Sequence, residues 1–291
     1  MVVFKPSQSS NPLSPPSDPV QRRLQSPPAK SKFLAVRGGD SGVLGKLFHK
    51  QQGALPDRKR KDDFKIGFFT SDKFPSRVPL DILYQDDVIV AVDKPAGQMV
   101  IPADKPQEGD EVTMKILRDQ IGKRVHPIHR LDRPTSGVLI FATDPEVARE
   151  LHFAFEQHEV EKVYWAVIVG RPLADEWTCE EPIQKKEGAP HRSARTDFKV
   201  LQPIKGNRTL IEAFPKTGRF HQIRRHLLHV GHPIVGDYRY AGVERCDYLG
   251  ELLGTESRML LQAKSLRLRH PVTGEELLIE APLDEAIAKC L

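Results

Sequence analysis

The sequence of 291 residues predicts an α+β fold built on a largely antiparallel or mixed sheet. Segments with the composition of short strands outnumber helical segments, and the two kinds do not alternate strictly along the chain. Strict alternation would favour a doubly wound parallel sheet, so its absence argues for α+β. The chain is also long enough to bury a sizeable core without disulfides or structural metals.

The first half of the predicted domain contains four strands, the first two joined by a turn, and two helices. The expected elements are strands at 82–84 and 88–92, a helix from Asp110, as its cap, to about Ile121, a strand at 138–142, a helix from Asp144 to about His158, and a strand at 162–169. The helix after Asp144 has the clearest signals: a cap residue, a proline at its first position and an acid in its first turn. Val147, Leu151 and Phe155 then follow at a spacing of four, which indicates a buried helix face.

The second half is predicted to be richer in strands. We expect strands at 194–201 and 209–214, a helix at 220–230, and a late hairpin of 260–268 and 276–279 around the turn at 271–274. Gly231 fits the position just after a helix, and Pro233 prevents the helix from continuing.

The first 78 residues differ in composition from the rest of the chain. Residues 1–79 hold 15 basic and 6 acidic side chains, a net charge of +9, and 10 of the 24 prolines. We therefore expect 1–78 to be a basic, Pro/Ser-rich extension that is largely disordered, with short ordered pieces around 42–48 and 64–69, and 79–291 to be the folded domain. The run Arg58–Lys61 could contact phosphates; a solvated basic tail without a dedicated partner is the alternative.

Several classes of protein are excluded by what the sequence lacks. The longest apolar run, at 163–169, has seven residues, far short of the roughly 20 that span a membrane. A Lys-Pro pair follows the first four residues, which argues against a signal peptide. The three cysteines stand far apart, so we expect a reducing, cytoplasmic location. No glycine-rich phosphate loop or dinucleotide motif is present, so no nucleotide cofactor is expected.

The segment 126–137 is a candidate functional loop. It lies between a predicted helix and the strand at 138, and loops held by rigid elements often carry function. Asp132 is flanked by Arg130 and Arg133, whose positive charge favours the carboxylate form. A plain structural role remains open at this point, with Asp132 capping the turn that follows it.

Two further segments could contribute to a site. Between Ala213 and Gly236 there are four Lys or Arg, four His and no acid, which suits a surface for phosphates. In the helix expected there, Ile223 facing the core would leave Arg224 at its edge, within reach of a cleft. On the strand at 162–169, alternation places Lys162 and Tyr164 on one face, where Tyr164 could stack on a flat ligand or belong to the core.

The histidines also suggest a metal site. His126, His129 and Asp132 are spaced by three, and four histidines cluster between 221 and 232. None of them has the helical pairing around a glutamate that marks a zinc enzyme, so we expect no catalytic metal.

Four motifs together resemble the RluA family of pseudouridine synthases. They are Lys94-Pro-Ala-Gly97, His129-Arg-Leu-Asp-Arg-Pro-Thr-Ser-Gly137, Lys162-Val-Tyr164 and Thr217-Gly-Arg-Phe-His-Gln-Ile-Arg224. They occur in the family's order, and the likeness covers about residues 80–283. Further stretches, such as 118–122, 155–158 and 216–227, are most similar to the tRNA pseudouridine(65) synthase branch (TruC). The long N-terminal extension departs from that pattern.

The resemblance implies a mixed, mostly antiparallel sheet with flanking helices and a catalytic cleft, and it implies an isomerase that converts uridine in RNA to pseudouridine after base flipping. It implies Asp132 as the catalytic aspartate, Tyr164 as the residue that stacks on the base, Arg224 as the partner of the carboxylate, Ile223 as its aliphatic neighbour, and Arg130 as the arginine associated with the flipped nucleotide. No cofactor is implied, because substrate and product are isomers.

The expected partner is therefore structured RNA. The resemblance favours tRNA, at uridine 65, with ribosomal RNA as the alternative target. A non-catalytic RNA-binding protein that uses the same cleft is a more distant alternative. We expect a monomer that is not associated with a membrane.

Overall fold

The computed structural model describes residues 2–5, 78–105, 107, 109–242 and 258–291. The expected ordered pieces at 42–48 and 64–69 and the basic run Arg58–Lys61 lie outside these residues. In the described part of the chain, no helix is long and apolar enough to cross a membrane.

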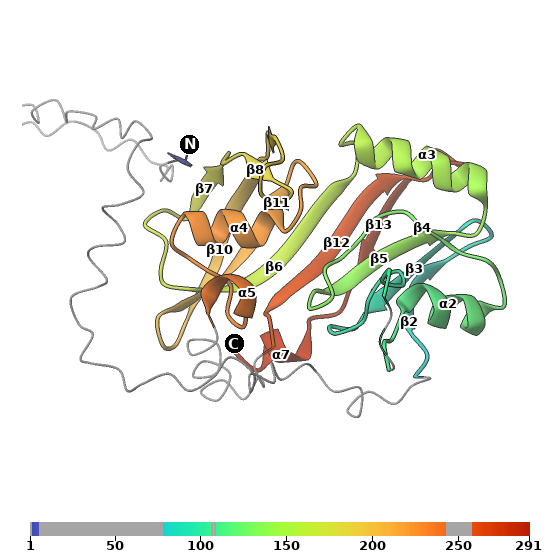
Figure 1. Ribbon diagram of the computed structural model, residues 1–291, viewed down its shortest axis with the longest axis horizontal. Coiled ribbons are helices and arrows are strands. Elements are labelled where there is room, and N and C mark those ends of the chain that lie inside the picture. Colours follow the sequence, from blue (N-terminus) through green and yellow to red (C-terminus); the bar gives the residue numbers. More distant parts are fainter. Residues whose placement is uncertain (1, 6–77, 106, 108, 243–257) are drawn as a thin grey trace, which may run out of the picture. The chain divides into compact units, whose positions relative to one another are not determined.

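One large, curved sheet organises the described residues (Figure 1). Its strand order is β1 (Val2–Lys5), β7 (Glu176–Cys179), β10 (Thr196–Ile204), β11 (Arg208–Pro215), β6 (Glu161–Val169), β12 (Leu261–Arg269), β5 (Ser136–Ala142), β3 (Ile89–Lys94) and β2 (Asp81–Gln85). Two strands lie off this path: β13 (Glu276–Glu280) pairs with β12, and β4 (His126–Pro127) pairs with β5. A separate small hairpin joins β8 (Ile183–Gln184) and β9 (His191–Arg192). Among these strands only β5 and β12 run parallel, which confirms a mixed, mostly antiparallel sheet.

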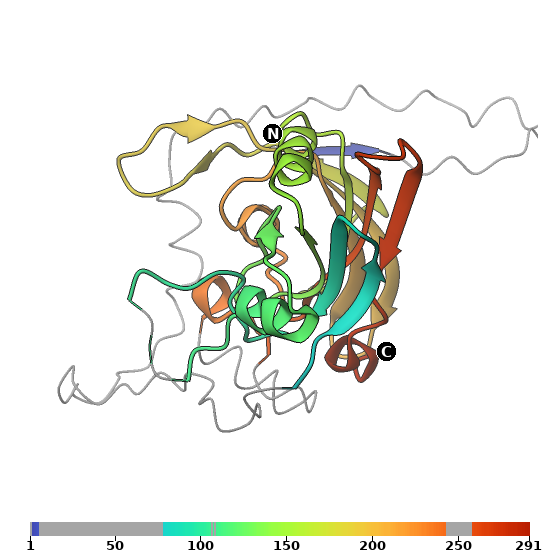
Figure 2. The same ribbon diagram turned by 90° about the vertical axis from the view of Figure 1, so that its right-hand side faces the viewer.

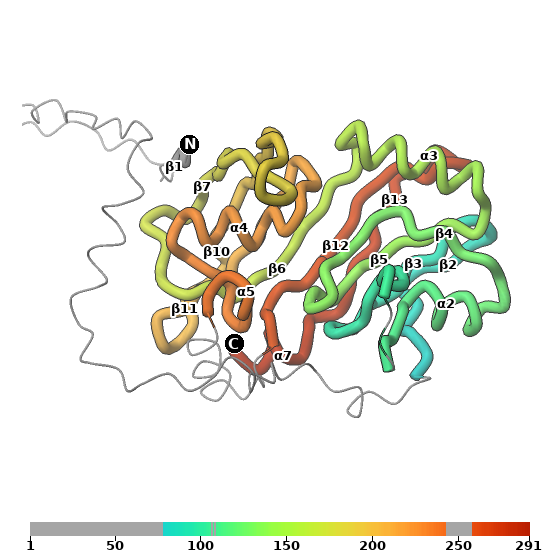
Figure 3. Tube along the Cα trace, viewed as in Figure 1, coloured from blue at the N-terminus to red at the C-terminus, as the bar shows by residue number. Residues whose placement is uncertain are grey.

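The parallel contact between β5 and β12 is short and depends on a glycine. It consists of Ser136 beside Gln262 and Gly137 beside Ala263. Gly137 has φ 105°, and a Cβ there would lie 2.2 Å from the backbone oxygen of Ala263. Beyond this contact the two strands separate, with β13 continuing the sheet on β12 and β4 continuing it on β5. Figure 3 shows β12, from the end of the chain, lying between β6 and β5.

Helices α2 (Thr113–Ile121) and α3 (Pro145–Glu156) pack on opposite faces of β3 and β5. Alternate residues of these strands divide between two apolar clusters. The cluster with α3 contains Ile89, Ala91, Val138 and Ile140, whereas the cluster with α2 contains Val90, Val92, Leu139 and Phe141. Figure 2 shows α3 and α2 with β4 and β5 between them. Burial on both faces explains why residues 138–142 of β5 are all apolar.

Helix α4 (Gln222–His229) covers the other half of the sheet. Its Ile223 and Leu227 pack against β6, β10 and β11 in a third apolar cluster. The short helices α5 (Tyr238–Ala241) and α7 (Glu285–Ala288) follow, the latter after β13.

Most of the predicted elements are present, and two predicted helix starts are wrong. Asp110 does not cap α2, which begins at Thr113 after the extended residue Val112. The Asp110 carboxylate instead accepts a hydrogen bond from the Gln107 amide and lies 3.4 Å from an Arg133 nitrogen. The start of α4 is Gln222 rather than 220, because the left-handed backbone before it interrupts the helix.

The cap of α3 is confirmed, because the Asp144 carboxylate accepts hydrogen bonds from the Glu146 and Val147 amides. The short elements β1, β4, β7, β8, β9, α5 and α7 were not predicted.

Candidate active site

A cleft of about 880 Å³ opens between the β4–β5 loop, β6, α3 and α4. All five residues singled out from the sequence line it: Arg130, Asp132, Tyr164, Ile223 and Arg224. They come from three separate stretches of the chain, and the sheet brings them together.

The loop that carries Asp132 is anchored on both sides of this residue. Leu131 and Thr135 are buried, and the Thr135 amide donates a hydrogen bond of 3.0 Å to the Asp132 carbonyl. The Asp132 side chain is 28% exposed. Its backbone is therefore fixed while its carboxylate faces the open space of the cleft.

Lys94 links this loop to the turn that follows β3. Its side chain is fully buried, and Nζ donates hydrogen bonds to the carbonyls of Pro95 at 2.7 Å, Gln98 at 3.0 Å and Arg133 at 3.3 Å. Burial, followed by the positive charge of Arg258, lowers the pKa of Lys94 to about 7. The three carbonyls match the three protons of an ammonium group. The lysine of the Lys94–Gly97 motif thus holds the turn after β3 against the loop that carries Asp132.

Arg224 joins two carboxylates. Its Nη1 donates a hydrogen bond of 2.8 Å to Asp132 Oδ2, while Nε and Nη2 form two bonds of 2.8 Å to the Asp237 carboxylate. The Arg224 and Asp237 side chains are 6% and 1% exposed. Burial opposes the charged form, but the bonds to Asp237 and Asp132 outweigh it and raise the pKa of Arg224. The guanidinium therefore stays charged beside Asp132.

Tyr164 and Ile223 form an apolar wall of the cleft. Tyr164 lies in the middle of β6, between Ala213 of β11 and Ala263 of β12. Burial and the negative charge of Asp132 raise the pKa of Tyr164 well above its usual value, so the phenol stays protonated. Ile223 is buried in the cluster against which Tyr164 packs.

The strand alternation predicted for β6 is present. Lys162 lines the same cleft as Tyr164, and Trp165 packs in a different cluster, where its indole N–H donates to Glu212 at 3.2 Å. Arg130 is exposed at the cleft, and no described residue forms an ion pair with it.

Three residues near Asp132 were not predicted from the sequence: Asp237, His221 and Tyr240. His221 Nε2 lies 3.6 Å from Asp132 Oδ2, and His221 Nδ1 lies 3.0 Å from the Tyr240 hydroxyl. One signal could have indicated Asp237, because it is the first acid after the acid-free stretch that contains Arg224. His221 lies inside the Thr217–Arg224 motif, unlike the histidines at 226, 229 and 232, but nothing in the pattern indicates its contact with Asp132.

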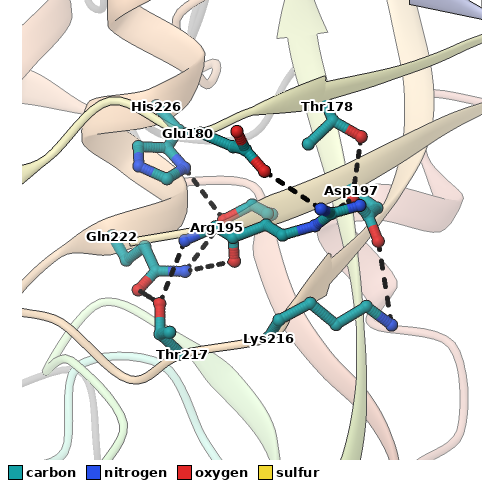
Figure 4. Close-up of polar contacts among 9 residues, drawn as sticks. Thr178, Glu180, Arg195, Asp197, Lys216, Thr217, Gln222 and His226 are labelled. Atoms are coloured by element: carbon teal, nitrogen blue, oxygen red, sulfur yellow. Dashed lines mark hydrogen bonds and ion pairs between the residues drawn. The ribbon is translucent and has the colours of Figure 1, made fainter. Parts of the chain in front are cut away.

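A polar network fixes the first turn of α4 at the cleft (Figure 4). The Gln222 amide accepts from the Thr217 hydroxyl at 2.6 Å and donates to the Arg195 carbonyl and the Thr196 hydroxyl at 2.9 Å. His226, one turn further, contacts the same Thr196 hydroxyl at 2.9 Å. The network joins α4 to β10, so the position of Arg224 is set by the sheet.

Several of the histidines considered as metal ligands form hydrogen bonds within the protein. His129 Nε2 accepts a hydrogen bond of 3.2 Å from the Ile140 amide, and its ring stacks on Phe155 at 4.9 Å. Burial lowers the pKa of His129 to about 3, so the ring is neutral. His226 and His232 contact the carbonyls of Glu181 and Val169. Among the described residues, no group of three or more His, Cys, Asp and Glu could hold a metal ion.

The chain is similar to known enzymes over most of its length. Residues 88–229 match a family model described as RNA pseudouridylate synthase. The tRNA pseudouridine synthase C of Vibrio cholerae serotype O1 is 40% identical over 225 residues, covering 71% of this chain and 92% of that protein. The tRNA pseudouridine synthase C of Yersinia pestis is also 40% identical over 225 residues, covering 71% and 87%.

Two solved structures have folds similar to that of this chain. Human RNA Pseudouridylate Synthase Domain Containing 4 superposes with a TM-score of 0.59 at 26% identity, covering 72% of this chain and 91% of that one. Human RNA Pseudouridylate Synthase Domain Containing 1 superposes with a TM-score of 0.57 at 25% identity, covering 71% and 87%. The sequence identity to these relatives, together with the shared fold, therefore shows that the chain belongs to the RNA pseudouridylate synthase family.

Proposed function

We propose that this protein is an isomerase that converts uridine to pseudouridine in tRNA, with Asp132 as its catalytic residue. The proposal rests on one observation above the others: an ionisable carboxylate, paired with a buried guanidinium, faces a cleft next to the half-buried aromatic ring of Tyr164. The tRNA target is supported by the printed names of the relatives at 40% identity.

The reaction breaks the bond between N1 of uracil and C1′ of ribose, and it forms a bond between C5 and C1′. The C5 proton is lost to solvent and N1 gains a proton, so substrate and product are isomers. An ionised Asp132 can attack C1′ or remove the C2′ proton, and either route needs the carboxylate form. Arg224, which stays charged, favours that form.

The other cleft residues have roles in holding the nucleotide. A base stacked in an RNA helix cannot reach Asp132, so the nucleotide must flip out, at a cost of a few kcal/mol. Stacking of the uracil on the Tyr164 ring offsets part of this cost, and Ile223 packs at the edge of the same pocket. Arg130, whose charge is not paired with any described residue, is placed to contact the flipped nucleotide or its phosphate.

The target within tRNA follows from the resemblance, which favours uridine 65. Ribosomal RNA is the alternative, since the cleft would accept a flipped uridine from either RNA. We further propose that the protein acts in the cytoplasm as a monomer and needs no cofactor for this isomerisation.

Release of the C5 proton tests the proposal. The purified protein, incubated with tRNA or ribosomal RNA fragments tritiated at uridine C5, should release tritium from tRNA and leave a pseudouridine that is mapped at one position. Asp132→Ala should abolish release while its affinity for the same RNA, measured by filter binding, stays within about threefold of the native value. Turnover by Asp132→Ala would refute the assignment, and release from ribosomal RNA alone would transfer the target to that RNA.

A further inference from the structure

His221 occupies an unusual place in the backbone. It has φ 52° and ψ 34°, the left-handed conformation, and immediately precedes α4. Non-glycine residues rarely adopt this conformation, and those that do cluster at functional sites. The left-handed turn leaves the side chain only 9% exposed and brings it to the same carboxylate oxygen that Arg224 contacts.

Contacts with two aromatic residues fix the orientation of the imidazole. The Tyr240 hydroxyl lies 3.0 Å from Nδ1, and the Tyr240 ring meets the imidazole edge-on at 5.8 Å. The Phe220 ring stacks on the imidazole, with centroids 3.7 Å apart. The Arg224 guanidinium lies 5.0 Å above the Tyr240 ring, so one tyrosine supports both neighbours of Asp132.

The protonation state of His221 follows from its surroundings. Burial lowers its pKa to about 4; the nearby charges of Arg224 and Arg239 act in the same direction, and those of Asp132 and Asp237 oppose it. The ring is therefore neutral at pH 7 and carries one N–H. Placing that N–H on Nε2 turns a donor toward the Asp132 carboxylate and leaves Nδ1 to accept from the Tyr240 hydroxyl.

We propose that His221, oriented by Tyr240, is a positioning residue that acts through Asp132 by directing a neutral N–H at Oδ2. The Oδ2 atom then has two partners, Arg224 at 2.8 Å and His221 at 3.6 Å, whereas Oδ1 has no hydrogen bond to any described residue. Oδ1 is consequently the oxygen that faces the ribose. Because 3.6 Å exceeds a hydrogen-bond length, the contact acts as an attraction between a charge and a dipole.

This inference rests on the proposed isomerisation, and its kinetic test is a comparison of variants with an active native protein. His221→Leu should lower kcat about five- to tenfold with KM for the RNA unchanged, because the residue lost acts on the carboxylate. His221→Gln, whose amide N–H can reach the same oxygen, should recover kcat to within about threefold of the native value. Tyr240→Phe should lower kcat about threefold.

The matched control is His229→Gln, on the exposed side of the same helix, which should leave kcat unchanged. Thermal denaturation shows whether each variant is folded. If folded His221→Leu keeps native kcat, or if the Gln variant is as slow as the Leu variant, the donor role is refuted. A native protein without activity on any uridine would instead refute the proposed function.

A second measurement does not depend on activity. Nitrogen NMR of selectively labelled histidine should show His221 as a neutral imidazole with its proton on Nε2 at pH 7 and a titration near pH 4. The Tyr240→Phe variant should show a mixture of the two tautomers. A proton on Nδ1, or a charged ring at pH 7, would overturn the proposal.

Discussion

Replacing Asp237 by Asn tests the buried ion pair that holds Arg224. The substitution keeps the size of the side chain but removes the charge, and it puts an amide N–H₂ where a carboxylate oxygen now accepts from the guanidinium. Because Arg224 and Asp237 are 6% and 1% exposed, water cannot replace the lost partner. Removing one member of a buried pair costs about 3–5 kcal/mol, and we expect the lower end because Arg224 keeps its bond to Asp132.

The expected loss is measurable by heat and by activity. For a domain of this size, about 3 kcal/mol corresponds to a fall in Tm of roughly 6–12 °C. The kcat for pseudouridine formation should fall at least about tenfold, because the guanidinium is no longer held beside the Asp132 carboxylate. Asp119→Asn is the matched control: it removes an Asp–Arg pair whose side chains are 67% and 54% exposed, and it should cost less than about 1 kcal/mol.

A double variant tests whether the loss of stability in Asp237→Asn comes from the unpaired charge of Arg224. If the cost of Asp237→Asn arises from an uncompensated guanidinium, adding Arg224→Met should restore at least about 1 kcal/mol of stability while activity stays low. A Tm for Asp237→Asn within 2 °C of the Asp119→Asn control would refute the reasoning, as would strictly additive losses in the double variant.

Two further predictions concern the residues that hold the Asp132 loop. Gly137→Ala should destabilise the protein by about 3 kcal/mol or prevent folding, since the new Cβ would meet the Ala263 backbone at φ 105°; urea unfolding measures this, and native stability would contradict it. Lys94→Met should cost about 3 kcal/mol, because three backbone carbonyls, that of Gln98 buried, lose their donor. The folded-state pKa of Lys94, about 7, lies below its ordinary value of 10.5, so the folded state binds fewer protons between these values. The native protein should therefore gain stability relative to Lys94→Met as pH rises from 7 to 9, by at most about 1.4 kcal/mol per unit, and urea unfolding that shows no such gain would contradict the shift.

The elements with repeated local signals were predictable from the sequence. Helix α3 begins at Pro145, directly after Asp144, as expected, because cap, proline and apolar spacing are all local signals within the helix itself. Helix α2 begins three residues after the predicted cap, since Asp110 pairs with Arg133, a residue distant in the sequence. Strands as short as β8 and β9 have too few residues to show a period.

Some residues of the candidate site were predictable from the sequence, and others were not. The motifs indicated Asp132, Tyr164 and Arg224, and the sheet places all three at one cleft. Asp237 and Tyr240 lie in a stretch with no pattern of its own, and only the packing of 236–241 against α4 brings them to Arg224 and His221. The role of Lys94 was equally hidden, because its three acceptors are backbone carbonyls, which leave no trace in a sequence.

The position of β12 has a consequence for how the protein is made. Strands β7, β10, β11 and β6 form one half of the sheet and β5, β3 and β2 the other, and β12, which begins at Leu261, is the strand that joins them. Asp132 lies in the loop just before β5, in one half, and Arg224 lies in α4, the helix that covers the other half. A nascent chain in which Leu261–Arg269 has not yet been made thus holds the carboxylate and the guanidinium on parts of the sheet that no strand joins. The protein cannot complete its centre until β12 has been synthesised, and a premature stop before Leu261 should yield an inactive product.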